Sequence, residues 1–219
     1  MRAAAPLLLS VNGGYVDAAG FLALQGLFTS HVTGNFVTAG AALVFGTTGL
    51  AAKLLALPVF AVVVALARIL GRAMAGQPAV RWAVLLTLQL VLLLIGSVLA
   101  IRFGPFANGD AIPAMLTGMV LVSGMAIQNA VHRVHLAAFP PSTIMTGNTT
   151  QLVLDAVDVV LIRTGGDVAA LRGRMGRTAA MVACFAGGCV AAALAFWLGG
   201  MWCFVVPPLL VLGALLLGR

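Results

Sequence analysis

Long uncharged runs of apolar residues alternate along this chain with short groups of arginine. A helix needs about 20 apolar residues to cross the hydrocarbon core of a membrane. Several runs reach that length, and the last one is long enough for two crossings with a turn at Gly199-Gly200. The pattern therefore predicts six membrane-spanning helices, at about 5–28, 54–72, 82–101 and 111–132 and as a pair within 178–218.

Two shorter segments, at about 33–50 and 146–162, have a helical composition but are interrupted by polar or charged residues. A Thr-Gly-Asn triplet stands at the start of each, at 33–35 and at 146–148. Threonine and asparagine are common at helix ends, and glycine permits a sharp bend of the backbone. We expect a broken or re-entrant helix at each triplet.

The triplets belong to a longer similarity between the two halves of the chain. Residues 30–35 (Ser-His-Val-Thr-Gly-Asn) align with 143–148 (Thr-Ile-Met-Thr-Gly-Asn) at an offset of 113 residues. Transporters are often built from such internal repeats. The alignment predicts a first repeat over 1–109 and a second over 110–219, each with three spans and one re-entrant segment.

The basic residues indicate how the two repeats are oriented. They follow the third segment of the first half but precede the corresponding segment of the second half, and basic loops stay cytoplasmic. Six spans with both termini in the cytoplasm place ten of the 12 basic residues inside and leave Lys53 and Arg102 outside. The predicted fold is an all-α, polytopic integral membrane protein with two inverted repeats. Eight spans in parallel repeats are the alternative topology.

The composition excludes several classes of protein. Hydrophobic residues make up 62% of the chain and charged residues 8%, whereas a soluble domain is about 45–50% apolar and about 25% charged. The net charge of +7 comes from arginines between apolar runs, which face lipid headgroups rather than nucleic acid. No catalytic, metal-binding or cofactor motif is present. We expect no enzymatic activity and no cofactor, with the lipid bilayer as a partner and a homo-oligomer left open.

Asp17 is the only acidic residue within a confidently predicted span. A charge in a membrane helix is costly and usually faces a partner or a cavity. We expect Asp17, with His31 beside the first triplet, to serve in coupling or gating. A structural hydrogen bond from Asp17 to Asn12, Tyr15 or a facing helix is the alternative.

Helix starts within the membrane favour an anionic or dipolar solute, because the positive ends of helix dipoles lie there. The region of the second half that corresponds to Asp17 holds a neutral amide pair. The predicted solute-binding residues are therefore Thr33, Gly34, Asn35, Thr146, Gly147, Asn148, Gln128 and Asn129.

Other polar and small residues have simpler interpretations. Asp155 and Asp158 share a helical face and are expected to pair with Arg163 or the basic residues that follow it. His132 and His135 are expected to form a patch at the membrane surface. The pairs Gly14-xxx-Ala18 and Ala183-xxx-Gly187 suit close helix packing.

The motifs also carry a resemblance. Gly-Tyr-Val-Asp-Ala at 14–18, the segment 28–35 and the second motif at 124–129 and 145–148 resemble the YoaK-like family of bacterial membrane proteins. The resemblance implies six transmembrane segments and an inner-membrane location, and it implies neither a substrate nor functional residues.

The sequence thus predicts a bacterial inner-membrane transporter or channel for a small polar or anionic solute, with its site between the two triplets. A non-transporting membrane scaffold or accessory protein is the alternative function. A transporter requires a polar cavity that reaches both triplets, whereas a scaffold is packed solid there.

Overall fold

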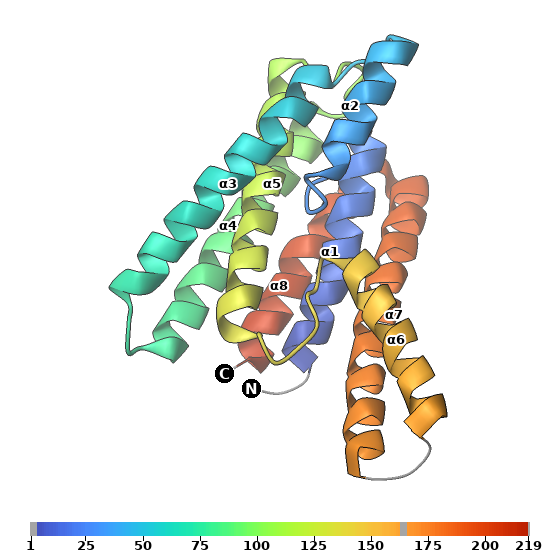
Figure 1. Ribbon diagram of the computed structural model, residues 1–219. Helices are drawn as coiled ribbons and strands as arrows, with labels where there is room; N and C mark the ends of the chain where they lie inside the picture. Colours follow the sequence, from blue (N-terminus) through green and yellow to red (C-terminus); the bar gives the residue numbers. More distant parts are fainter. Residues whose placement is uncertain (1–3, 163–165, 219) are drawn as a thin grey trace.

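The computed structural model describes residues 4–162 and 166–218, which form an all-helical chain (Figure 1). Proline stands in the first turn of α4, α5 and α8, where the missing N–H costs no helical hydrogen bond. The elements are α1 (Ala4–Ala23), α2 (Gly34–Phe45), α3 (Leu50–Ala73), α4 (Pro78–Phe103), α5 (Ile112–His135), α6 (Met145–Ile162), α7 (Gly166–Gly199), the 3-10 helix η1 (Gly200–Val205) and α8 (Val206–Leu217).

Four helical segments of the described chain are long and apolar enough to cross a membrane: α3, α4, α5 and the run Val168–Leu217. The last run is bent at η1, so that α8 runs back along the bundle and packs against α1 and α4 (Figure 1). The expected turn at Gly199-Gly200 is therefore confirmed. These helices indicate an integral membrane protein. The crossing predicted for 5–28 corresponds to α1, which is outside these four segments, and stays a prediction.

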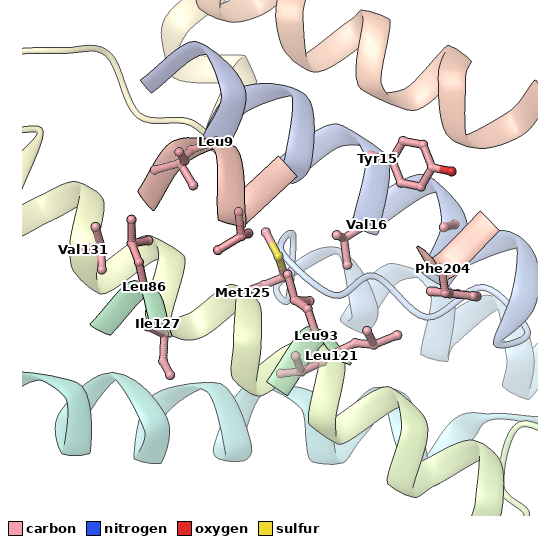
Figure 2. Close-up of a cluster of buried hydrophobic side chains, with 14 of the residues drawn as sticks. Leu9, Tyr15, Val16, Leu86, Leu93, Leu121, Met125, Ile127, Val131 and Phe204 are labelled. Carbon is pink, nitrogen blue, oxygen red and sulfur yellow. The ribbon is translucent and has the colours of Figure 1, made fainter. Parts of the chain in front are cut away.

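The core lies between α1, α4, α5 and α8, with α1 packed along α7 on its other side. Leu9 and Val16 of α1 face Leu93 of α4 and Met125 of α5 in this cluster (Figure 2). Each of the four side chains is fully buried. The helices most distant along the chain therefore share one apolar centre.

The contact between α1 and α7 is unusually close at two glycines. A Cβ on Gly14 would lie 2.0 Å from the carbonyl oxygen of Phe185, and a Cβ on Gly188 would lie 2.2 Å from that of Val11. Gly187 has no heavy atom within 4 Å of its Cβ position. The predicted packing role is thus correct for Gly14 and wrong for Gly187, because its neighbour Gly188 is the glycine that faces α1.

The two short helices run in opposite directions. In Figure 1, α2 starts about halfway along the bundle and runs to the end where α3 begins, whereas α6 starts at a similar height and runs to the other end. The first residue of α2, Gly34, belongs to the first Thr-Gly-Asn triplet, and the first residue of α6, Met145, directly precedes the second. Both starts are therefore held inside the bundle rather than at its ends.

Asp110, in the connection between α4 and α5, caps the start of α3. Its carboxylate accepts hydrogen bonds from the backbone N–H groups of residues 49–52, at 2.8–3.3 Å. Burial opposes the charged form, but these donors together lower the pKa of Asp110. This cap fixes the connections at the end of the bundle far from the chain termini.

Candidate functional site: an arginine-lined cavity between two helix starts

A cavity of about 780 Å³ lies between the starts of α2 and α6, with further walls from α3, α4 and α5. Thr33 of the first triplet and Thr146 of the second both line it. The polar side chains around it are Ser30, His31, Thr33, Arg68, Arg81, Asn129, Arg133, Thr143 and Thr146. The cavity thus touches one residue of each triplet, and apolar side chains make up the rest of its lining.

Three arginines from three helices line this cavity. Arg68 lies near the end of α3, Arg81 near the start of α4 and Arg133 near the end of α5. Among the described side chains the ion pairs are His31–Asp17 and Arg174–Asp155, and neither involves these arginines. Three positive charges that form no ion pair within the described residues give this cavity a positive electrostatic potential.

One of these arginines is oriented by a neighbouring side chain. The Nε atom of Arg81 donates a hydrogen bond to Nε2 of His135 at 3.0 Å. His132, one turn earlier, is 4% exposed, and its Nε2 lies 3.2 Å from the carbonyl oxygen of Phe139. The predicted surface patch of two histidines is wrong for His132, because the segment after α5 folds back over it.

The first triplet is braced by Asn35. Its Oδ1 accepts a hydrogen bond from the backbone N–H of Phe28, and its Nδ2 donates one to the carbonyl oxygen of Phe28, both at 2.8 Å. Asn35 is 1% exposed. The amide therefore closes the segment before α2 and is not directed at the cavity.

The second triplet is braced in a similar way by Asn148. Its Nδ2 donates to the carbonyl oxygen of Pro141 at 2.7 Å, across the same interval of seven residues. Proline has no N–H, so a return bond like that in the first half cannot form. Asn148 is also buried.

The start of α2 offers fewer free N–H groups than a helix break usually does. The N–H groups of Gly34, Asn35 and Phe36 donate to carbonyl oxygens three residues earlier, at 2.8–3.3 Å. Thr33 makes no capping hydrogen bond with its side chain. The positive end of the helix dipole still faces the cavity, but the arginines supply most of the charge.

Asp17 holds the loop that precedes α2. Its Oδ1 accepts from the N–H groups of Thr29 and Ser30, both at 2.8 Å, and its Oδ2 lies 2.6 Å from Nδ1 of His31. The alternative partners Asn12 and Tyr15 bind elsewhere, to the Gln128 side chain and to the carbonyl oxygen of Cys203. The single carboxylate of α1 therefore meets a histidine.

The corresponding position in the second half is neutral. Asn129 accepts a hydrogen bond from the Thr143 hydroxyl at 2.6 Å, and both residues line the cavity. The loops before α2 and α6 are thus held by side chains of different charge, as the amide pair in the sequence predicted.

Gln128 lies outside the cavity, in a buried network of amides. Its Oε1 accepts from Asn12 and Gln89, each at 2.8 Å, and its Nε2 donates to the carbonyl oxygen of Leu9 at 2.7 Å. All three side chains are fully buried. Gln89 was missed in the sequence because a single amide in an apolar span has no distinctive spacing.

A second hollow, of about 620 Å³, lies between α1, α7 and the start of α2. Its walls are mostly apolar, and Asp17, His31 and Thr33 are among its few polar residues. His31 and Thr33 border both hollows. The first hollow adjoins the arginine-bearing ends of α3, α4 and α5, and the second adjoins the later halves of α1 and α7, toward the other end of the bundle (Figure 1).

The predicted site residues therefore fall into five groups. The large cavity is lined by Thr33, His31, Asn129 and Thr146, and the second hollow is lined in addition by Asp17 and Gly34. The loops before α2 and α6 are braced by Asn35 and Asn148, and Gln128 lies in the core. Gly147 lies at the start of α6, outside both hollows.

Asp155 of α6 has the structural role that was expected of it, whereas no ion pair of Asp158 is found among the described residues. Oδ2 of Asp155 accepts from Nε of Arg174 at 2.7 Å, and its Oδ1 accepts from Gln151 at 2.7 Å. Asp158 is exposed. Arg163, the other predicted partner, lies outside the described residues. Asp155 thus ties α6 to α7, and its ion pair is separate from the arginine-lined cavity.

Comparison with known proteins places this helical chain in one family. Residues 5–217 match the family model described as Protein of unknown function (DUF1275). Neither the comparison with curated proteins nor the one with solved structures found a match. The family match covers both halves of the chain, and the likeness to the YoaK-like family stays a resemblance.

Proposed function

We infer that this chain, which belongs to the DUF1275 family of unknown function, passes a small anionic solute across a membrane through the arginine-lined cavity. The observation that carries the proposal is the position of the cavity, between the two Thr-Gly-Asn triplets and against three arginines that pair with no carboxylate in the described part of the chain. Placed in the inner membrane of a bacterium, the protein is a transporter or channel.

The proposed architecture has six spans in two inverted repeats. The first repeat consists of α1, the re-entrant α2, α3 and α4, and the second consists of α5, the re-entrant α6, α7 and α8. Two observations support it: α2 and α6 run in opposite directions from similar heights, and α1 begins at the end of the bundle where α8 finishes (Figure 1). Both termini then lie in the cytoplasm with the arginine-bearing ends of α3, α4 and α5.

The chemistry of the cavity suits an oxyanion or a halide. A guanidinium group presents several N–H donors in a plane and keeps its charge at any physiological pH. The hydroxyl of Ser30 lines the cavity, is buried and has no hydrogen-bond partner within the described structure, so it is available to a solute. Thr33, Thr146 and Asn129 add further polar contacts, while Asn35 and Asn148 act as positioning residues.

The cavity also separates transport from the scaffold alternative. A scaffold gains stability from filling the space between its helices, because lost contacts around a void are costly. The hollow of about 780 Å³ that touches both triplets leaves this space unfilled by the described side chains. This observation favours transport.

The test is anion uptake into liposomes that contain the purified protein, with labelled chloride, sulfate and phosphate as probes. Arg68→Gln, Arg81→Gln and Arg133→Gln each remove one charge from the cavity. We expect each to lower uptake of the transported anion about tenfold or more, since hydrogen bonds to a charged group contribute about 1.5–3 kcal/mol.

The matched controls are Arg72→Gln and Arg102→Gln, which remove exposed arginines that do not line the cavity. Both variants are expected to transport like the unmodified protein. Uptake of all three anions at the rate of protein-free liposomes would contradict the proposal, and so would equal losses in the cavity and control variants.

A further inference from the structure

We propose that His31 is a proton-binding site that couples anion passage to the movement of a proton. The proposal rests on the proposed function and names the coupling ion. Its basis is the place of the imidazole, which borders both the arginine-lined cavity and the second hollow. A group at the boundary of two hollows is suited to exchange a proton with each in turn.

The geometry around Asp17 leaves one nitrogen of His31 for this exchange. An ionised carboxylate only accepts hydrogen bonds. Its contact with Nδ1 of His31, at 2.6 Å, therefore holds the proton of the neutral ring on Nδ1. Nε2 then carries the lone pair, and within the described structure no hydrogen bond involves this atom. The proton that moves is bound and released at Nε2.

Asp17 is itself held in place. Its Oδ1 receives two backbone N–H bonds at 2.8 Å, from Thr29 and Ser30. Phe185 of α7 flanks the imidazole edge-on, with the ring centroids 5.6 Å apart. The carboxylate and the aromatic ring together restrict the imidazole to a fixed orientation between the hollows.

The charges around His31 link proton binding to anion binding. The ionisable groups that face it are Asp17 of α1, Cys189 of α7 and, around the cavity, Arg68, Arg81 and Arg133 of α3, α4 and α5. Three arginines beside an empty cavity oppose a further positive charge on the ring, and a bound anion offsets them. Because such coupling is reciprocal, the proton and the anion each favour binding of the other.

The step leaves no chemical change behind. Nε2 takes one proton from water on one side of the partition, and the imidazolium returns the same proton to water on the other side after the anion has moved. The second hollow is lined mostly by apolar side chains, among them Phe21, Leu22 and Phe185.

The experiment imposes a proton gradient on the liposomes while potassium and valinomycin hold the membrane potential at zero. Chloride and sulfate are the probes, because their charge is constant between about pH 5 and about pH 8, where histidine titrates. One proton moved with each anion gives about tenfold accumulation of the transported probe for a gradient of one pH unit. The readout is the ratio of accumulation with and without the gradient.

Variants of His31 and Asp17 test whether these two residues couple the proton to the anion. We expect His31→Gln to reduce the ratio to about one. Asp17→Asn keeps the acceptor for the backbone of Thr29 and Ser30 but removes the charge that fixes the ring, so its ratio also falls toward one. His135→Gln is the histidine control: it lowers uptake through its bond to Arg81 and leaves the ratio near the unmodified value.

The outcomes separate the two proposals. Anion uptake without dependence on the proton gradient overturns the coupling and leaves the proposed function standing, whereas no uptake of chloride, sulfate or phosphate overturns both. A ratio near ten in both His31→Gln and Asp17→Asn also overturns the role of the pair. Elution of each variant as a single species in detergent shows that a lost ratio does not reflect unfolding.

Discussion

At the scale of single residues, asparagine is matched to the loops that it closes. Asn35 uses both the donor and the acceptor of its amide on one backbone unit, that of Phe28. Asn148 uses only its donor, because Pro141 lacks the N–H that would complete the pair. The asparagine amide carries a donor and an acceptor on separate atoms of one short side chain, which suits it to close a loop on a single backbone unit.

This difference predicts unequal costs for the two asparagines. Asn35→Ala leaves a buried N–H and a carbonyl oxygen without partners, whereas Asn148→Ala leaves one carbonyl oxygen. We expect the free energy of unfolding to fall by about 2–3 kcal/mol for Asn35→Ala and by about 1 kcal/mol for Asn148→Ala. Unfolding followed by circular dichroism in detergent measures both. Equal losses for both alanine variants would contradict this account.

At the scale of elements, α1 depends on its contact with α7. Glycines at 14 and 188 let the two backbones approach until the carbonyl oxygens of Phe185 and Val11 occupy the space of a Cβ. The approach also sets the position of Asp17, one turn after Gly14, against the loop before α2. The packing of two long helices therefore positions the proposed coupling pair.

A methyl group at this contact must push the helices apart. We expect Gly14→Ala and Gly188→Ala each to lower the free energy of unfolding by about 1–3 kcal/mol, as overpacking of a tight core does. Gly187→Ala is the matched control, since its Cβ would meet no heavy atom within 4 Å. Thermal unfolding in detergent ranks the stabilities of the three variants. A loss of stability in Gly187→Ala as large as in Gly188→Ala would contradict the assignment of the contact.

At the scale of the whole molecule, the two ends of the bundle differ in charge. Arg68, Arg81 and Arg133 lie toward the end that holds the start of α1 and the finish of α8 (Figure 1). Asp110 and its cap lie at the other end, with the start of α3. This asymmetry agrees with basic residues on the cytoplasmic side.

The six-span topology predicts opposite exposure for two surface positions. In a variant without the three native cysteines, Arg72→Cys and Thr47→Cys place single thiols at exposed residues near opposite ends of α3. We expect a membrane-impermeant maleimide added outside intact cells to label position 47 and not position 72. Labelling of position 72 from outside would instead favour eight spans in parallel repeats.

Features that depend on residues close together in the chain could be predicted from the sequence, whereas contacts between distant residues could not. Helix bounds follow from apolar runs and local breaks, so α3, α4 and α5 agree with the predicted spans within a few residues. The partner of Asp17 is 14 residues away, beyond the reach of a helical pattern, and the alternatives Asn12 and Tyr15 were closer in sequence but bind elsewhere. Gly187 and Gly188 differ only in which one faces α1, and composition cannot choose between adjacent glycines.

The sequence by itself determined the class of this protein, because too few charges are present to make a soluble surface and the uncharged runs have the length of membrane helices. It also indicated Asp17, since an isolated carboxylate in an apolar run is costly wherever the helix lies. Only the tertiary structure decided that Arg68, Arg81 and Arg133 share one cavity with both triplets. Three helices bring these arginines together, and the packing that does so depends on contacts between residues far apart in the chain.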